Sequence, residues 1–168
     1  MIKTTAPLIV TLKLDEATQS FFNALRETYF PKHVNYMDAH CTLFHNLPSQ
    51  NTAIQKILKE SARRPVINMQ VRSVSNIGNG VVYTIESNEL QMLHQCMQQH
   101  FSEWLINQDR QQLKPHITVQ NKVTAFKALS LFKKLNDRFE PFDIKATGIS
   151  TWLYLKGPWE HVADYNFA

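Results

Sequence analysis

Two short segments of the same form, His-x-Thr followed by apolar residues, constrain this chain more than any other feature. The first is Ala39–Phe44 and the second is Pro115–Gln120, with helical patterns in the sequence between them. We expect both segments to form short strands that face each other across one cleft. The fold must then bring together two copies that lie far apart in the chain.

Strand geometry places the polar residues of each segment on one face. Successive side chains of a strand point to opposite faces, so residues i and i+2 share a face. His40 therefore shares a face with Thr42, and His116 shares one with Thr118. The residues between and after them are apolar or nearly so. Each strand is thus predicted to have one core face and one face that carries imidazole and hydroxyl groups.

Hydrophobic periodicity predicts strands and helices in a repeated order. The expected elements are a strand over 7–14, a helix over 15–31, a strand over 40–46, a helix up to 63–65, a hairpin turning at 78–80, a helix over 88–106, the second His-x-Thr strand, a helix after 124, and strands over 142–146, 152–155 and 159–167. This order contains strand, helix, His-x-Thr strand, helix and hairpin in each half. We therefore expect one α+β domain over residues 1–168, with two lobes.

Composition and charge exclude several classes of protein. The hydrophobic content of 43% and charged content of 19% are typical of a globular chain. There is no apolar run of about 18 residues and no signal-peptide pattern, and Cys41 and Cys96 form no disulfide framework. We expect a cytoplasmic protein with no membrane partner and no obligate protein partner. The net charge of +4 fits an anionic ligand, and equally fits ordinary solubilising charge.

Two histidines in one cleft suit phosphoryl chemistry near neutral pH. The ordinary pKa of imidazole is about 6.5, so one ring can be neutral while the other is protonated. The neutral ring accepts a proton from the attacking oxygen, and the protonated ring donates one to the leaving oxygen. Threonine hydroxyls can donate hydrogen bonds to the non-bridging phosphate oxygens. This chemistry requires neither a metal ion nor a cofactor.

The two motifs resemble those of the two-histidine (2H) phosphoesterase superfamily, which includes bacterial 2′-5′ RNA ligase-like proteins and cyclic nucleotide phosphodiesterases. The resemblance rests on the ranges 40–43 and 115–119, and on the similar segments 120–123 and 157–159. It implies a duplicated, bilobal α+β fold with pseudo-twofold symmetry, in which two antiparallel-rich sheets line a central cleft and helices lie outside. It also implies that His40 and His116 are catalytic and that Thr42 and Thr118 bind phosphate. The implied substrates are nucleotides or RNA ends with 2′,3′-cyclic phosphates or 2′-5′ linkages, and ligation is the reverse reaction.

Further residues are candidates for the substrate pocket, and each also has a simpler interpretation. Phe44 can stack on a base or pack between lobes, and Gln120 can bind a ligand or face solvent. Lys114 can attract a phosphate, and Tyr154 can line the pocket or pack in the core. The remaining histidines are interpreted as structural or surface residues: His33, His45, His94, His100 and His161.

Two other functions remain open from the sequence alone. One is a nucleotide or RNA-end binding module that keeps the cleft without turnover. The other is an interaction domain in which both triplets occur by chance. Paired titratable imidazoles favour the enzyme, because binding alone does not require them. The sequence does not distinguish which histidine is the base.

Overall fold

The computed structural model describes residues 5–168, which form seven strands, four α-helices and two short 3₁₀ helices. The strands are β1 Leu8–Leu14, β2 Thr42–Leu47, β3 Ile67–Asn76, β4 Val81–Glu86, β5 His116–Gln120, β6 Phe142–Tyr154 and β7 Trp159–Asn166. The helices are α1 Glu16–Tyr29, η1 Lys32–Val34, α2 Thr52–Ser61, α3 Asn88–His100, η2 Gln108–Arg110 and α4 Ala125–Asp137. The α+β class expected from the sequence is confirmed.

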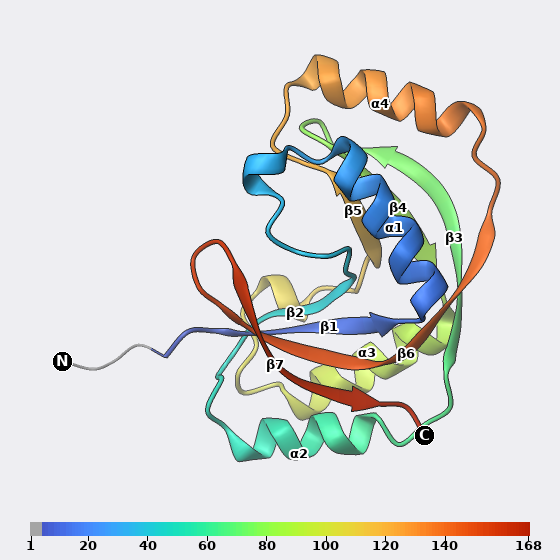
Figure 1. Ribbon diagram of the computed structural model, residues 1–168. Helices are drawn as coiled ribbons and strands as arrows, with labels where there is room; N and C mark the ends of the chain where they lie inside the picture. Colours follow the sequence, from blue (N-terminus) through green and yellow to red (C-terminus); the bar gives the residue numbers. More distant parts are fainter. Residues whose placement is uncertain (1–4) are drawn as a thin grey trace.

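All seven strands belong to one antiparallel sheet, ordered β2-β1-β6-β3-β4-β5, with β7 also paired to β6. We expected two sheets, but strand β6 connects the two groups of strands. Its first residues pair with β3, and its later residues pair with β1 and β7. Figure 1 shows β3 and β6 curving along one side of the molecule, so that the two groups face different directions. The duplication of the lobes stays a prediction.

Strand β6 is a single strand of 13 residues, although the sequence pattern predicted two separate strands. The apolar alternation is interrupted around Gly148, which explains the error. A Cβ atom at this position would lie 2.6 Å from the Tyr165 carbonyl oxygen on β7. Glycine is therefore needed because the neighbouring backbone approaches closely, and the strand continues through it.

The helices pack on both groups of strands. Helix α1 contacts β5, α4 contacts β3, and α3 contacts both α2 and β3. In Figure 1, α1 crosses the strands β3, β4 and β5, while α2 and α3 lie beside the group that contains β1 and β6. The largest fully buried side chains of the core are apolar: Phe22, Phe44, Phe101, Leu43, Leu47, Ile54, Leu58, Ile67, Leu90, Met97, Ile117 and Ile149.

Polar side chains define where three helices begin. Asn51 accepts hydrogen bonds from the first turn of α2, Ser87 from α3 and Thr124 from α4. Helix α3 ends at His100, earlier than the periodicity predicted, because the chain turns there into the segment that holds η2. Gln98 fixes this turn by donating to the carbonyl oxygens of Asp109 at 2.9 Å and Gln111 at 2.8 Å.

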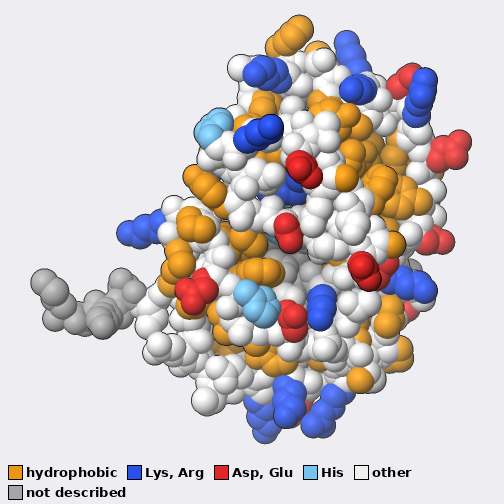
Figure 2. All heavy atoms as spheres, viewed as in Figure 1, with side chains coloured by type: hydrophobic (Ala, Val, Ile, Leu, Met, Phe, Trp, Pro, Cys, Tyr) orange, Lys and Arg blue, Asp and Glu red, His pale blue; other side chains and the backbone are white. Residues whose placement is uncertain are grey.

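None of the helices within residues 5–168 combines the length and apolar character that crossing a bilayer requires. Figure 2 shows one face of the molecule, where Lys and Arg side chains gather mainly near the top and bottom rims. Acidic, hydrophobic and histidine side chains occupy more of the middle of this face.

Candidate active site

The two His-x-Thr motifs converge although their strands lie at opposite ends of the sheet order. The thiol of Cys41, the residue that follows His40, lies beside the backbone of His116. Burial raises the pKa of this thiol to about 12, and the neighbouring His116 backbone opposes that change. Cys41 is therefore a buried, neutral core residue, as the sequence suggested, and its proximity to His116 places the first motif beside the second.

Strand β2 begins at Thr42, so His40 lies in the segment just before the strand rather than within it. The expected alternation nevertheless holds across Cys41. Cys41 is fully buried, while His40 and Thr42 on either side of it are half-buried. His116 is exposed and is the first residue of β5, and Thr118 is half-buried two positions later.

The two imidazoles are oriented by the same kind of hydrogen bond. His40 Nδ1 lies 2.8 Å from the Asp38 carbonyl oxygen, and His116 Nδ1 lies 2.8 Å from the Lys114 carbonyl oxygen. A carbonyl oxygen only accepts hydrogen bonds, so each Nδ1 carries a proton. Both rings therefore present Nε2, which accepts a proton when the ring is neutral and donates one when it is charged.

The environment of His40 favours the neutral ring. Burial lowers its pKa from the ordinary value of 6.5 to about 4. The hydrogen bond with the Asp38 carbonyl opposes this change, while nearby Arg26, His116 and His45 add to it by electrostatic repulsion. The Trp159 ring packs against the imidazole with 4.7 Å between ring centroids. His40 is thus an uncharged base at pH 7.

Two cavities lie at the motifs. The larger has a volume of about 610 Å³, and its wall includes Thr42, His116 and Lys114. The smaller has a volume of about 190 Å³, and its wall includes His40 and Trp152. The larger cavity has the size of a small-ligand site, about 300–1,000 Å³.

A β-bulge in strand β2 changes which side chains reach the larger cavity. Thr42 pairs with Thr11 and Phe44 with Val10, so two steps along β2 match one step along β1. The extra residue turns Phe44 into the core, where it is fully buried and stacks on His94 with 4.7 Å between ring centroids. Of the two interpretations of Phe44, packing is confirmed and a place in the pocket is not, because strict alternation does not continue through the bulge.

Two further candidate pocket residues lie elsewhere. Gln120 is 6% exposed and buried at the end of β5, where its side-chain oxygen has no hydrogen-bond partner among the described residues. Tyr154 is 41% exposed at the end of β6, where it pairs with Trp159. Of the four candidate pocket residues named from the sequence, Lys114 lies at the wall of the larger cavity, and Phe44, Gln120 and Tyr154 do not.

Arg26 was not singled out from the sequence, although it joins both motifs. Its Nη1 donates to the Thr118 carbonyl oxygen at 2.9 Å, and its Nε donates to the Met37 carbonyl oxygen at 3.1 Å. The side chain is 5% exposed, and burial lowers its pKa to about 10, so it stays charged at pH 7. Its place four residues after Phe22, on the buried side of α1, is the sequence signal that could have identified it.

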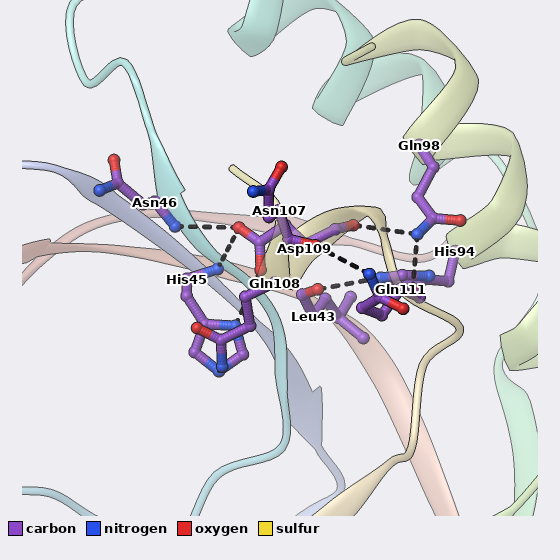
Figure 3. Close-up of polar contacts among 9 residues, drawn as sticks. All are labelled: Leu43, His45, Asn46, His94, Gln98, Asn107, Gln108, Asp109 and Gln111. Carbon is purple, nitrogen blue, oxygen red and sulfur yellow. Dashed lines mark hydrogen bonds and ion pairs between the residues drawn. The ribbon is translucent and has the colours of Figure 1, made fainter. Parts of the chain in front are cut away.

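His45 and Asp109 also reach the larger cavity without having been expected there. Figure 3 shows His45 from β2 directed at the Asp109 carboxylate from η2. One signal in the sequence could have identified His45. The polar pair His45-Asn46 lies between Phe44 and Leu47, and two successive polar residues interrupt the alternation of a strand, as a bulge does. Among residues 5–168, no group of three or more His, Cys, Asp or Glu side chains is placed to hold a metal ion.

Comparisons with known proteins agree with this geometry. The model of the 2′-5′ RNA ligase superfamily matches residues 14–158, whereas no curated protein matches significantly. Similar solved structures include TT0787 of Thermus thermophilus, with a TM-score of 0.69, 16% identity and coverage of 96% of this chain and 97% of that one. E. coli LigT complexed with NADP+ has a TM-score of 0.61, 12% identity and coverage of 97% and 98%. E. coli LigT complexed with 3′-AMP has a TM-score of 0.59, 13% identity and coverage of 98% and 99%. With most of its length matched, the chain belongs to the 2′-5′ RNA ligase superfamily, within the 2H phosphoesterases that its two motifs resemble.

Proposed function

We propose that the chain is a metal-independent phosphodiesterase that acts on a cyclic or 2′-5′ phosphodiester of an RNA end or small nucleotide. The observation that carries this proposal is the matched orientation of His40 and His116. Each ring is held through Nδ1 by the carbonyl oxygen two residues earlier, and each presents Nε2. Two imidazoles oriented in the same way, one in each motif, are suited to paired acid and base catalysis.

In the proposed hydrolysis, neutral His40 is the base and His116 is the acid. His40 Nε2 takes a proton from water as the water oxygen bonds to phosphorus, and His116 Nε2 gives a proton to the sugar oxygen as its bond to phosphorus breaks. The hydroxyls of Thr42 and Thr118 donate hydrogen bonds to the non-bridging oxygens. A bound phosphate is anionic and favours the protonated form of a nearby imidazole, so it makes His40 a better base than it is in the free protein.

The membership of the superfamily supports a phosphoesterase, and the neighbouring structures support a nucleotide substrate. The structures of LigT contain NADP+ in one case and 3′-AMP in another. Ligation through a 2′-5′ bond would use the same two histidines with their roles exchanged, because a reaction and its reverse share one transition state. Hydrolysis is the proposed direction in water, which competes with the sugar hydroxyl as the attacking group.

The test measures turnover of 2′,3′-cyclic nucleotides and 2′-5′-linked dinucleotides in the presence of a chelator. Wild type should remain active, while His40→Ala and His116→Ala should each lower kcat at least about 100-fold. His100→Ala is the matched control, because His100 is an exposed histidine at the end of α3. Retained activity in both motif variants would overturn the assignment. Nucleotide binding without turnover in wild type would favour the binding module instead.

A further inference from the structure

His45 lies in the wall of the larger cavity, together with Thr42 and His116. A second register shift in β2, between Phe44 and Leu47, leaves two successive exposed residues, His45 and Asn46, between these buried residues. The side chain of His45 is 45% exposed. It is also near enough to His40 to influence the pKa of that ring. His45 therefore shares a cavity wall with one residue of each motif, Thr42 and His116, although it is part of neither motif.

Asp109 holds His45 in a defined orientation. Its Oδ1 lies 2.8 Å from His45 Nδ1, and its Oδ2 accepts the backbone N–H groups of His45 at 2.8 Å and Asn46 at 3.1 Å. The Asp109 side chain is only 1% exposed. A carboxylate held by backbone donors is an acceptor, so His45 Nδ1 carries a proton. In the neutral ring Nε2 is an acceptor and lies 3.5 Å from the side-chain nitrogen of Gln108, and it becomes a donor when the ring is protonated. Figure 3 shows this pair bridging β2 and the segment that contains η2.

The wall around His45 is rich in hydrogen-bond donors. It includes the ammonium group of Lys114 and the side-chain amides of three glutamines: Gln108, Gln111 and Gln112. The one carboxylate of this wall is Asp109, and both of its oxygens are already bonded to β2. Lys114 therefore brings a positive charge to this wall, and the amide nitrogens of the glutamines bring neutral donors, a combination that suits an anion. The volume of about 610 Å³ leaves room for more than the phosphate held between the motifs.

We infer that His45 and Lys114 bind a second phosphate of the substrate, beyond the one on which His40 and His116 act. This inference rests on the proposed function and makes the substrate class narrower. The substrate would be a nucleotide unit with two phosphates, as at an RNA end whose last nucleoside carries the scissile phosphate on its 2′ or 3′ oxygen and another on its 5′ oxygen. A 5′ phosphate would favour the protonated ring of His45, whose Nε2 would donate to it together with Lys114 Nζ, and the amides would contact the nucleoside.

The test measures binding rather than turnover, so its result does not depend on the proposed reaction. Adenosine 3′-monophosphate and adenosine 3′,5′-bisphosphate are titrated by calorimetry into wild type, His45→Ala and the control His100→Ala. We expect wild type to bind the bisphosphate at least about 10-fold more tightly, because a charge-assisted hydrogen bond is worth about 1.5–3 kcal/mol. His45→Ala should reduce this preference to about 3-fold or less, whereas His100→Ala should keep it.

Equal affinity of wild type for the two ligands, or failure to bind either, would overturn the inference. So would equal losses for both ligands in His45→Ala, which would make His45 a general support of the fold. Turnover of cyclic phosphates without the bisphosphate preference would leave the proposed function intact and remove only this inference. A bisphosphate preference without turnover would retain the second phosphate site and remove the proposed hydrolysis.

Discussion

The guanidinium of Arg26 donates a hydrogen bond to the backbone carbonyl of Thr118 at 2.9 Å, and so ties helix α1 to the second motif. The same group donates to Asn35 Oδ1 at 3.0 Å and to the Met37 carbonyl at 3.1 Å, in the segment that leads to His40. One buried side chain is therefore shared by both motifs. No strand pairing joins β2 to β5 in the sheet, so the hydrogen bonds of Arg26 supply a link between the two motifs that the sheet does not.

Arg26→Met should lower both stability and activity. The methionine roughly keeps the apolar stem but leaves the buried carbonyl of Thr118 and that of Met37 without their donor. We expect a loss of about 2–4 kcal/mol in the free energy of unfolding, measured with urea. In conditions where the variant remains folded, kcat should fall about 10-fold, because the two imidazoles are no longer held in register.

The control for this variant is Arg72→Met. Arg72 on β3 is exposed and pairs with Glu86 at 3.1 Å, so its loss should change the free energy of unfolding by less than about 1 kcal/mol. An Arg26→Met protein as stable and as active as wild type would contradict the role of Arg26 in joining the motifs.

Much of the fold could be predicted because helix and strand periodicities are local properties of the sequence. The strand Leu8–Leu14 and the cap of the helix after Thr124 depend on neighbouring residues alone. The pairing of β3 with β6 could not be predicted, because it depends on contacts between distant residues. The single sheet, in place of two, follows from that pairing.

The candidate site shows the same division between local and distant causes. The sequence was enough to identify the four motif residues, because strand alternation places the His and the Thr of each His-x-Thr triplet on the same face: His40, Thr42, His116 and Thr118. Phe44 could not be placed correctly, because a bulge depends on the register with the neighbouring strand. A charged residue in a helix likewise shows its role only when its partners are known, as with Arg26 and the carbonyl of Thr118.

The titration of His40 should have its midpoint near pH 4. NMR of the imidazole Cε1 proton should show the neutral ring down to about pH 5. The unfolded chain binds this proton near the ordinary value of 6.5, so it binds more protons than the native state between these pH values. The contribution of His40 to stability is therefore complete above 6.5 and is lost as the pH falls to about 4. A midpoint near 6.5 in the folded protein would contradict the burial of the ring.

Trp159→Ala should raise the pKa of His40 toward 6.5. The indole packs on the imidazole at 4.7 Å and excludes water from it, and burial is the largest cause of the low pKa. Trp159→Phe keeps an aromatic ring at this place and should leave the midpoint near 4. The NMR titration of the two variants distinguishes them. An unchanged midpoint in Trp159→Ala would show that residues other than Trp159 cause the low pKa of His40.

Thr42→Val and Thr118→Val should each lower kcat/KM for a cyclic phosphate about 10- to 100-fold. Valine keeps the shape of threonine but removes the hydroxyl proposed to bind a charged phosphate, a bond worth about 1.5–3 kcal/mol. Thr28→Val is the matched control, because the Thr28 hydroxyl is exposed and bonds only to Ala24 within α1 among the described contacts. A loss in Thr28→Val as large as in the motif variants would point to a general effect on folding.

Gly80→Ala should be far more destabilising than Gly78→Ala, although both glycines lie in the β3–β4 turn. A Cβ atom at Gly80 would lie 2.0 Å from the Gln120 carbonyl oxygen and 2.7 Å from the Asn121 Cα, so the end of β5 must move. We expect a loss of more than about 3 kcal/mol in urea unfolding, with reduced kcat because β5 carries the second motif. Gly78 has a φ of +93° but no atom within 4 Å of the added methyl group, so its variant should lose only about 1–2 kcal/mol through backbone strain. Equal losses in the two variants would show that the turn conformation, and not the approach of β5, requires Gly80.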